Sequence, residues 1–209
     1  MLNPADHTYQ GIITSKTCRS VTTILAEAGW IEKKWFRDGR AELGTQCHRM
    51  IDAYNKRLKF TAPAIYLRYL DPYKSFLKHT NAEVIGSEIE IEDISLGVSG
   101  TMDILLRLPG SGVGVLDVKF SQCGYLPSHD LQTAAYARGL LFHPKYKNLK
   151  IDWRGGIIFS PDCVMPRLIN HDRMPDADRV WQATAVFIAA KHRHKIAMEK
   201  IDKENGWVA

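Results

Sequence analysis

The residues of this sequence that could do chemistry are two aspartates and a lysine within otherwise apolar segments. The stretch GVLDVKF, residues 114–120, alternates apolar side chains and is rich in β-branched residues, so it predicts a buried strand. Asp117 and Lys119 are two residues apart on this strand, so their side chains share one face. The preceding stretch VSGTMDILLRL predicts a second strand that carries Asp103, and the intervening PGSG predicts a tight turn.

The apolar residues of the two strands predict how the strands pair. One shared core face requires Ile104 opposite Leu116 and Met102 opposite Val118, because a slip of one residue would expose one of the two apolar sets. The turn then has an odd number of residues and is centred on Gly110. On this interpretation each strand is apolar on one face and charged on the other.

The same pairing brings the two carboxylates together. Asp103 falls directly opposite Asp117, with the Cβ atoms roughly 4.5–5.5 Å apart, and facing carboxylates repel. A divalent cation such as Mg²⁺ would remove the repulsion, because hard cations bind carboxylate oxygens. With Lys119 beside it, such a site suits metal-assisted hydrolysis of a phosphodiester. The alternative is a surface ion pair between Lys119 and one of the aspartates.

The surrounding segments predict helices packed on a central sheet. Helix signals recur at residues 21–28, 39–58, 64–80, 129–142 and about 176–200, and strand signals at 82–93, 98–108, 113–120, 151–160 and 163–170. This order predicts an α/β fold with a mixed central β-sheet flanked by helices. We expect Pro72 to kink or divide the third helix, and the last helix to carry Val180, Phe187 and Ile188 inward.

No linker divides the chain, so the prediction is one domain over residues 1–209. Its parts would be a core at about 40–170, an N-terminal helical part at 1–39 and a C-terminal helix at about 176–200.

The composition is that of an ordinary globular protein with an excess of basic residues. Lysine and arginine number 28 against 23 acidic residues, and the resulting pI near 9.0 permits nucleic-acid binding without requiring it. The four cysteines form no CxxC pair, and the N-terminus lacks a secretion signal, so we expect a cytoplasmic protein with reduced thiols. No apolar run approaches the ~20 residues that span a bilayer, so we expect no membrane association.

Motifs along the chain, taken together, resemble the PD-(D/E)XK nuclease superfamily, and most closely its RecB-like and phage-exonuclease branch. They are RSVTTIL at 19–25, GTQCH at 44–48, SEIEI at 87–91, SGTMD at 99–103, LDVK at 116–119 and QTAAY at 132–136. The resemblance covers about residues 19–137. It implies a restriction-endonuclease-like αβββαβ core with additional N-terminal and C-terminal helices.

The resemblance also implies roles for individual residues. Asp103 and Asp117 would be the principal metal ligands, joined by the Val118 carbonyl and by His48, with Lys119 as the catalytic lysine. Glu88 would lie near the metal or its water, and substrate contacts would come from Thr101, Gln132 and Tyr136. The alternatives are a packing role for His48, Gln132 and Tyr136 and, for Glu88, one of three solvated glutamates on an exposed face.

Basic clusters predict further contacts with DNA. They are Lys16 with Arg19, Lys33 with Lys34, and the run 191–195, from which we single out Lys191 and Arg193 as substrate contacts. Trp30, Trp35 and Phe36 lie among the early basic residues and could stack on bases at a strand end. The alternative for each cluster is a solvated charged face.

Other chemistries find little support in the sequence. GVSGT is not a G-x-S-x-G motif, and Cys47 and His48 are adjacent on a helix, which is poor geometry for a thiolate–imidazole pair. Cys163 is the only cysteine in the last third of the chain, so no iron–sulfur cluster is expected, and clustered ligands for structural zinc are lacking.

The prediction is therefore a metal-dependent DNA exonuclease that uses one or two Mg²⁺ or Mn²⁺ ions. It would act on single- or double-stranded DNA ends in recombination or repair, in the cytoplasm of a bacterium or phage-infected cell. A single-strand annealing or single-strand-binding protein is a candidate partner. Two alternatives stay open: an endonuclease of the same superfamily, which is structure- or sequence-specific, and a non-catalytic nucleic-acid-binding module.

Overall fold

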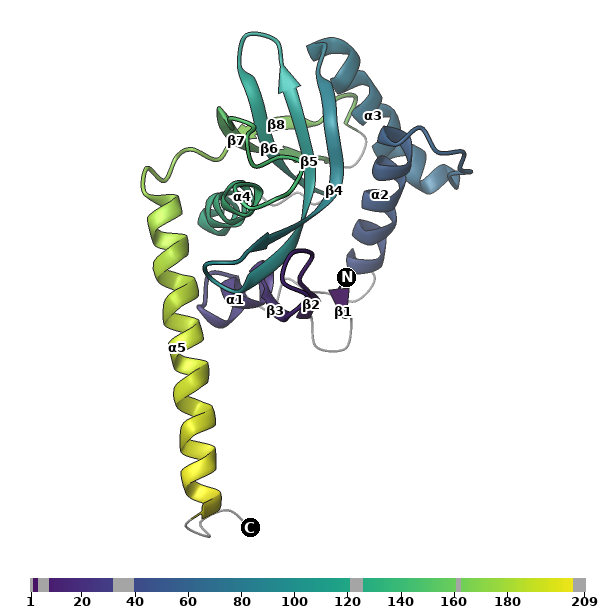
Figure 1. The fold of residues 1–209 in the computed structure, drawn as a ribbon. Helices are drawn as coiled ribbons and strands as arrows, with labels where there is room; N and C mark the ends of the chain where they lie inside the picture. The colour runs from purple at the N-terminus through teal and green to yellow at the C-terminus, as the bar shows by residue number, and fades with distance from the viewer. Residues whose placement is uncertain (1, 4–7, 32–39, 121–125, 161–162, 205–209) are drawn as a thin grey trace.

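The computed structural model describes residues 2–3, 8–31, 40–120, 126–160 and 163–204. The predicted basic pair Lys33 and Lys34, the aromatic residues Trp35 and Phe36, and Cys123 lie outside these residues. Helices flank a central sheet, as Figure 1 shows, so the predicted mixed α/β fold is confirmed.

The predicted helices and strands between residues 21 and 204 are present, with small shifts at their ends. The helices are α1 (Val21–Glu27), α2 (Arg40–Asn55), α3 (Ala64–Thr80), α4 (Pro127–Leu140) and α5 (Ala177–Glu204). The strands are β1 (Leu2–Asn3), β2 (Thr8–Gln10), β3 (Thr17–Ser20), β4 (Glu83–Asp93), β5 (Val98–Leu108), β6 (Gly112–Lys119), β7 (Trp153–Ile158) and β8 (Arg167–Asn170). The sheet order is β1-β2-β3-β5-β6-β7-β8, and β4 pairs with β5.

The hairpin of β5 and β6 has the predicted register, but its pairing ends early. Ile104 pairs with Leu116 and Leu108 with Gly112, around a three-residue turn in which Gly110 has a φ of 79°. That left-handed conformation favours glycine. The pairing stops at Ile104, so the expected pair of Met102 with Val118 is not formed.

The strands separate because β5 changes its partner along one edge. The first residues of β5, Val98 and Ser99, pair with β3 in parallel, whereas residues 104–108 of β5 pair with β6. The edge of β5 between these two partners, residues 100–103, forms a fork in the sheet, and Asp103 is the fork residue next to the hairpin.

Both faces of the sheet are covered, which corrects the prediction of one apolar and one charged face. Val113 and Val115 belong to a core beneath α1, α4 and α5, whereas Leu116 and Val118 belong to a second core beneath α2 and α3. Figure 1 shows α2 and α3 on one side of the sheet and α4 and α5 on the other. Burial on both faces is typical of strands with parallel partners. Asp117 is consequently fully buried rather than displayed on a surface.

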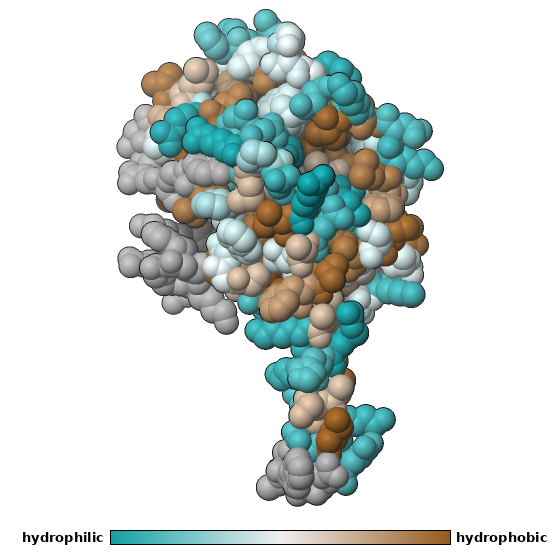
Figure 2. All heavy atoms as spheres, turned by 90° about the vertical axis from the view of Figure 1, so that its left-hand side faces the viewer, coloured by the Kyte–Doolittle hydropathy of each residue, from teal (hydrophilic) through white to brown (hydrophobic). Residues whose placement is uncertain are grey.

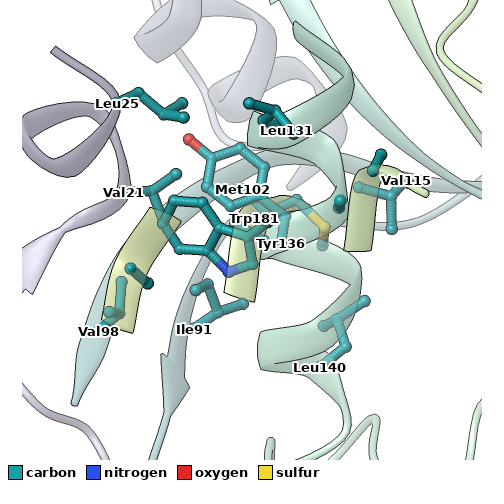
Figure 3. Close-up of a cluster of buried hydrophobic side chains, with 14 of the residues drawn as sticks. Val21, Leu25, Ile91, Val98, Met102, Val115, Leu131, Tyr136, Leu140 and Trp181 are labelled. Atoms are coloured by element: carbon teal, nitrogen blue, oxygen red, sulfur yellow. The ribbon is translucent and has the colours of Figure 1, made fainter. Parts of the chain in front are cut away.

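The core beneath α1, α4 and α5 is built around large side chains from several elements. Figure 3 shows Trp181 of α5 beside Tyr136 of α4 and Met102 of β5. All three side chains are buried, and burying a large apolar side chain contributes about 1.5–3 kcal/mol each. This packing fixes α4 over the fork.

The N-terminal part, predicted to be helical, also contains strands β1 to β3. β2 and β3 form an antiparallel hairpin before α1 begins, and Ser20 caps α1 by accepting a hydrogen bond from the Thr23 amide at 3.0 Å. Glu92, one of the three glutamates on β4, is buried and accepts hydrogen bonds from the amides of Ile13 and Thr14 in the β2–β3 loop. The solvated-face interpretation is therefore wrong for Glu92.

Two expectations about the helices need correction. Pro72 lies inside one continuous helix, α3, so it does not divide the helix, and a kink at Pro72 stays a prediction. The residues of α5 that face the core are Trp181, Ala185 and Ile188. Phe187 is 64% exposed, because adjacent helix residues point about 100° apart and its neighbour Ile188 is the one that faces the core. Within the described residues, no helix combines the length and the apolar character needed to cross a membrane.

Candidate metal centre

Three separate elements bring His48, Glu88 and Asp103 together. Cys47 and Ile51, one helical turn apart, are buried and hold α2 on the sheet, which places His48 at the edge of that contact. Glu88 lies on β4 between residues that pair with β5 on either side of Asp103. Glu88 has a φ of 45°, a conformation that is uncommon for a residue other than glycine and is often found at functional sites.

The geometry of these three residues suits a cation. The Nδ1 atom of His48 lies 3.4 Å from Glu88 Oε1 and 3.8 Å from Asp103 Oδ1. One ligand atom from each residue lies within 4.8 Å of the other two. A cation at about 2.0–2.2 Å from nitrogen and oxygen ligands would fit between atoms at this spacing after small side-chain adjustments.

The fork in the sheet fixes Asp103. Its Oδ2 atom accepts a hydrogen bond from the Val118 amide at 2.6 Å, so the carboxylate bridges the two strands where their backbone pairing has ended. The other oxygen, Oδ1, is the atom that faces His48. The predicted backbone pair of Asp103 with Asp117 is not formed, because the pairing of β5 with β6 ends at Ile104, and Asp103 instead contacts β6 through its side chain.

The electrostatics of the cluster favour bound protons in the metal-free protein. Burial raises the pKa of Asp103 to about 7, because the attraction of His48 only partly offsets the burial and the repulsion of Asp117. For His48, burial lowers the pKa, but Asp103 and Glu88 outweigh that effect and raise it to about 9. A divalent cation would take the place of these protons.

Asp117 and Lys119 lie next to this cluster rather than in it. Asp117 Oδ1 accepts a hydrogen bond from Lys119 Nζ at 2.8 Å. The two residues thus form an ion pair, as the alternative interpretation expected, but the carboxylate of this pair is buried rather than on the surface. Asp117 Oδ2 is buried and has no hydrogen-bond partner among the described residues. An unsatisfied buried acceptor costs about 1–3 kcal/mol or more, so this oxygen also fits a cation that takes an oxygen ligand.

Of the predicted site residues on α4, Gln132 lies beside the lysine and Tyr136 contacts Gln132. Gln132 Oε1 lies 3.5 Å from Lys119 Nζ, and Gln132 Nε2 donates a hydrogen bond to the Tyr136 hydroxyl at 2.9 Å. Burial raises the pKa of Tyr136 well above its usual value, and the nearby Asp103 and Asp117 raise it further. Both α4 side chains are buried, so this geometry favours positioning of Lys119, and their contact with DNA stays a prediction. The role of the Val118 carbonyl also stays a prediction.

An open pocket of about 420 Å³ leads to the cluster. It is lined by Thr45, His48, Arg49, Asp52, Glu88 and Asp103. Sequence reasoning missed Thr45, Arg49 and Asp52, although their spacing around His48 at i−3, i+1 and i+4 places them on neighbouring faces of one helix. Asp52 also accepts a hydrogen bond from Ser87 at 2.6 Å, which links α2 to β4 beside the pocket.

Other residues near the fork were not predicted. The Tyr9 hydroxyl lies 3.2 Å from Thr101 Oγ1, so the predicted substrate contact Thr101 meets the N-terminal hairpin. His129 and His171 are buried, with ring centroids 5.6 Å apart, and burial lowers the pKa of His171 to about 4. No local motif marks these three residues, because each reaches the site only through long-range packing.

The basic residues of α5 are not brought to this site. Lys191 and Arg193 are exposed on a helix that packs on α1 and α4, across the sheet from α2 and His48 (Figure 1). Their role as substrate contacts stays a prediction that the site geometry does not support.

Comparisons with known proteins add little to this geometry. No known family profile and no curated protein matches the chain. Among solved structures, LHK-Exo in complex with dAMP has a TM-score of 0.42 and 12% identity, covering 92% of this chain and 95% of its own. SSO0001 has a TM-score of 0.34 and 18% identity, covering 80% and 75%. These scores are below the level that establishes a common fold, so the functional argument depends on the site itself.

Proposed function

We propose that this chain is a metal-dependent deoxyribonuclease of the PD-(D/E)XK type, and more specifically an exonuclease. The observation that carries the proposal is the convergence of His48, Glu88 and Asp103 from three elements. They lie next to the buried Asp117 oxygen, which has no hydrogen-bond partner within the described parts of the chain. A packing role for His48 or a solvated role for Glu88 would not explain why both side chains meet Asp103.

The residues present fit one or two divalent cations. His48, Glu88 and Asp103 would hold an ion, and Asp117 would add its Oδ2 atom from the neighbouring strand. Mg²⁺ or Mn²⁺ in this position would activate a water and neutralise charge on the scissile phosphate.

The chain itself supplies a positioned cation. Lys119 is held by Asp117 at 2.8 Å and lies 3.5 Å from Gln132, so its ammonium group has a fixed place beside the acidic cluster. A fixed positive charge stabilises the negative charge that develops on phosphate oxygens in the transition state. Asp117 is buried, and the electrostatic attraction between its carboxylate and the Lys119 ammonium group is stronger where water is excluded.

The direct test is digestion of end-labelled single- and double-stranded DNA oligonucleotides by the purified chain with Mg²⁺, Mn²⁺ or EDTA. We expect cleavage with either metal and none with EDTA. Absence of cleavage under every metal condition would contradict the assignment.

Covalently closed circular DNA distinguishes the exonuclease from the endonuclease alternative. An exonuclease leaves the closed circle intact and degrades it only after linearisation, whereas an endonuclease cuts the circle. A circle with a single nick is a further substrate, because it offers a strand end to an exonuclease while an endonuclease does not need one.

Calorimetry with Mn²⁺ addresses the alternative of a non-catalytic nucleic-acid-binding module. Such a module would bind DNA without any metal site that depends on Asp103. The proposed enzyme requires metal binding that is lost in Asp103→Asn. A cytoplasmic location, a role in recombination or repair, and association with a single-strand annealing or single-strand-binding protein remain predictions from the resemblance.

A further inference from the structure

The second half of α5 is separate from the rest of the molecule. Ile188 is the last buried residue of the helix, and every residue from 191 to 201 is exposed. We call residues 189–204 the α5 arm. Figure 1 shows the arm extending beyond the body, and Figure 2, viewed from the side that α5 covers, shows apolar and polar side chains both exposed along it.

The arm has little packing to stabilise it. Most helical stability in proteins comes from packing of an apolar face rather than from the helix alone. Within the described residues, α5 packs on α4 and α1 through its first half only. The arm is therefore the part of the described fold with the least support.

The arm carries an apolar stripe on the side opposite the core. At about 100° per residue, five residues fall within about 80° of the helix surface. They are Phe187, two residues before the arm begins, and Ala190, His194, Met198 and Ile201 within it, and all except His194 are apolar. The core-facing residues Trp181, Ala185 and Ile188 lie on the other side of the same helix. The stripe is thus a second packing face, and no described residue covers it.

Charged residues flank this stripe in a complementary arrangement. Lys191 and Asp202 are 11 residues apart, which is about three turns, so they lie on the same flank. Arg193 and Glu204 have the same spacing and lie on the other flank. Lys191, Arg193 and Asp202 form no ion pair with another described residue, and Glu204 meets only the exposed Lys200, at 3.8 Å.

We propose that the arm pairs with the arm of a second copy of this chain, in antiparallel orientation, through the apolar stripe. In an antiparallel pair related by a twofold axis, each flank of one helix meets the same flank of the other. Lys191 of each copy then meets Asp202 of its partner, and Arg193 meets Glu204. Both pairings form when the helices cross near residues 197 and 198.

The distribution of charge favours a second copy over nucleic acid. The first part of the arm is basic, with Lys191, Arg193 and Lys195, whereas all its acidic residues lie in the last six positions, 199–204, where Lys200 and Lys203 also occur. With three acids and two lysines, this end has a net charge of −1 and offers DNA no continuous basic face. An antiparallel copy places that end beside the basic part of its partner, and it also covers the apolar stripe.

The test is the molecular mass of the full chain in solution, measured by sedimentation equilibrium. We expect the wild type to be a dimer and Met198→Asp to weaken dimerisation by at least about tenfold, because a carboxylate would be buried in the interface. Ile196→Asp is the matched control. Ile196 is 54% exposed and Met198 42%, but Ile196 lies on the opposite side of the arm, so this variant should remain a dimer.

The orientation is tested by exchanging charges. Lys191→Asp and Asp202→Lys should each weaken the dimer by about fivefold, and the double variant should restore it, because residues 191 and 202 meet only between copies. A parallel pair would show no rescue. Thermal unfolding of each variant checks that the body of the protein is still folded.

Three results would overturn the proposal: a monomeric wild type at the highest soluble concentration, equal weakening by Met198→Asp and Ile196→Asp, or failure of the charge exchange to restore the dimer. A monomer whose duplex-DNA binding falls in Lys191→Asp would instead assign the arm to nucleic acid. None of these measurements involves metal or cleavage, so the nuclease proposal is tested separately.

Discussion

At each end of β6 an aspartate side chain accepts a hydrogen bond from the strand backbone, and the pKa values of the two aspartates are shifted in opposite directions. Near the hairpin turn, Asp152 Oδ2 accepts a hydrogen bond from the Val113 amide at 2.9 Å. In the fork, Asp103 Oδ2 accepts a hydrogen bond from the Val118 amide at 2.6 Å. Hydrogen bonds from Lys150 and the Val113 amide lower the pKa of Asp152. Burial raises the pKa of Asp103 to about 7.

The difference shows that the hydrogen bond to the strand does not determine whether the pKa of the aspartate is raised or lowered; the surroundings of the carboxylate do. Asp152 has an exposed lysine 2.6 Å away and contact with solvent, so its charge is satisfied without a ligand. Asp103 shares a partly buried site with Glu88, next to the buried Asp117, and the charges of these carboxylates favour a bound cation. The regular end of the hairpin is therefore structural, and the fork is the end at which we expect function.

The largest expected effect is on cleavage. Asp103→Asn keeps an acceptor for the Val118 amide but removes the negative charge, so we expect the rate of DNA cleavage to fall by about 10²–10³-fold or more. Lys119→Ala should have an effect of similar size. Asp152→Asn, which preserves the matching bond at the other end of β6, should cleave at the wild-type rate, and a comparable loss in this control would contradict the comparison.

The second expected effect is stabilisation by metal. At a Mn²⁺ concentration 100 times the dissociation constant, the wild type should gain about 2.7 kcal/mol in free energy of unfolding. Asp152→Asn should gain the same amount and Asp103→Asn much less. Thermal unfolding with Mn²⁺ or EDTA measures the difference, and an equal gain in both variants would place the metal elsewhere.

The third expected effect is the pH dependence of metal binding. The pKa of His48 is raised to about 9, so the metal-free site holds a proton that the cation must displace. The apparent Mn²⁺ affinity should therefore rise between pH 6 and pH 9, by at most about tenfold per pH unit for each displaced proton. Calorimetry in buffers with different ionisation enthalpies should also detect released protons, and an affinity independent of pH would exclude His48 as a ligand.

The smallest expected effect is on the stability of the metal-free protein. The folded-state pKa of Asp103 lies above its unfolded value, so its contribution to stability is full at low pH and is lost as the pH rises to about 7. At pH 8, Asp103→Asn should therefore stabilise the protein, on the order of 1 kcal/mol. The pKa of Asp152 is lowered, so its contribution is present above its unfolded pKa, and Asp152→Asn should destabilise at pH 8. Urea unfolding in EDTA tests both signs.

Local patterns in the sequence predicted much of this structure. Strict alternation fixed the pairing of Ile104 with Leu116, and helical spacing placed His48, Gln132 and Tyr136 on helices. The approach of His48 and Glu88 to Asp103 came only from the family resemblance, because residues far apart in sequence meet through tertiary packing.

What could not be predicted depends on long-range contacts. β1 to β3 are two to four residues long, too short for a periodic signal, and the fork exists only because β5 changes partner. The burial of Asp117 follows from α4 covering a face that the sequence pattern suggested was open. Phe187 was assigned inward because two apolar stripes occur on α5 and only one meets the body.

The change of partner along β5 has a consequence for the order of folding. The turn between β5 and β6 closes over three residues, whereas the pairing of Arg19 on β3 with Val98 on β5 joins segments separated by most of the first half of the chain. Local pairings form faster than distant ones, because closing a long loop costs more entropy. We therefore expect the hairpin to form early and the N-terminal strands to dock late, so that a newly made chain acquires a rigid hairpin before it acquires the complete surroundings of Thr101 and Asp103.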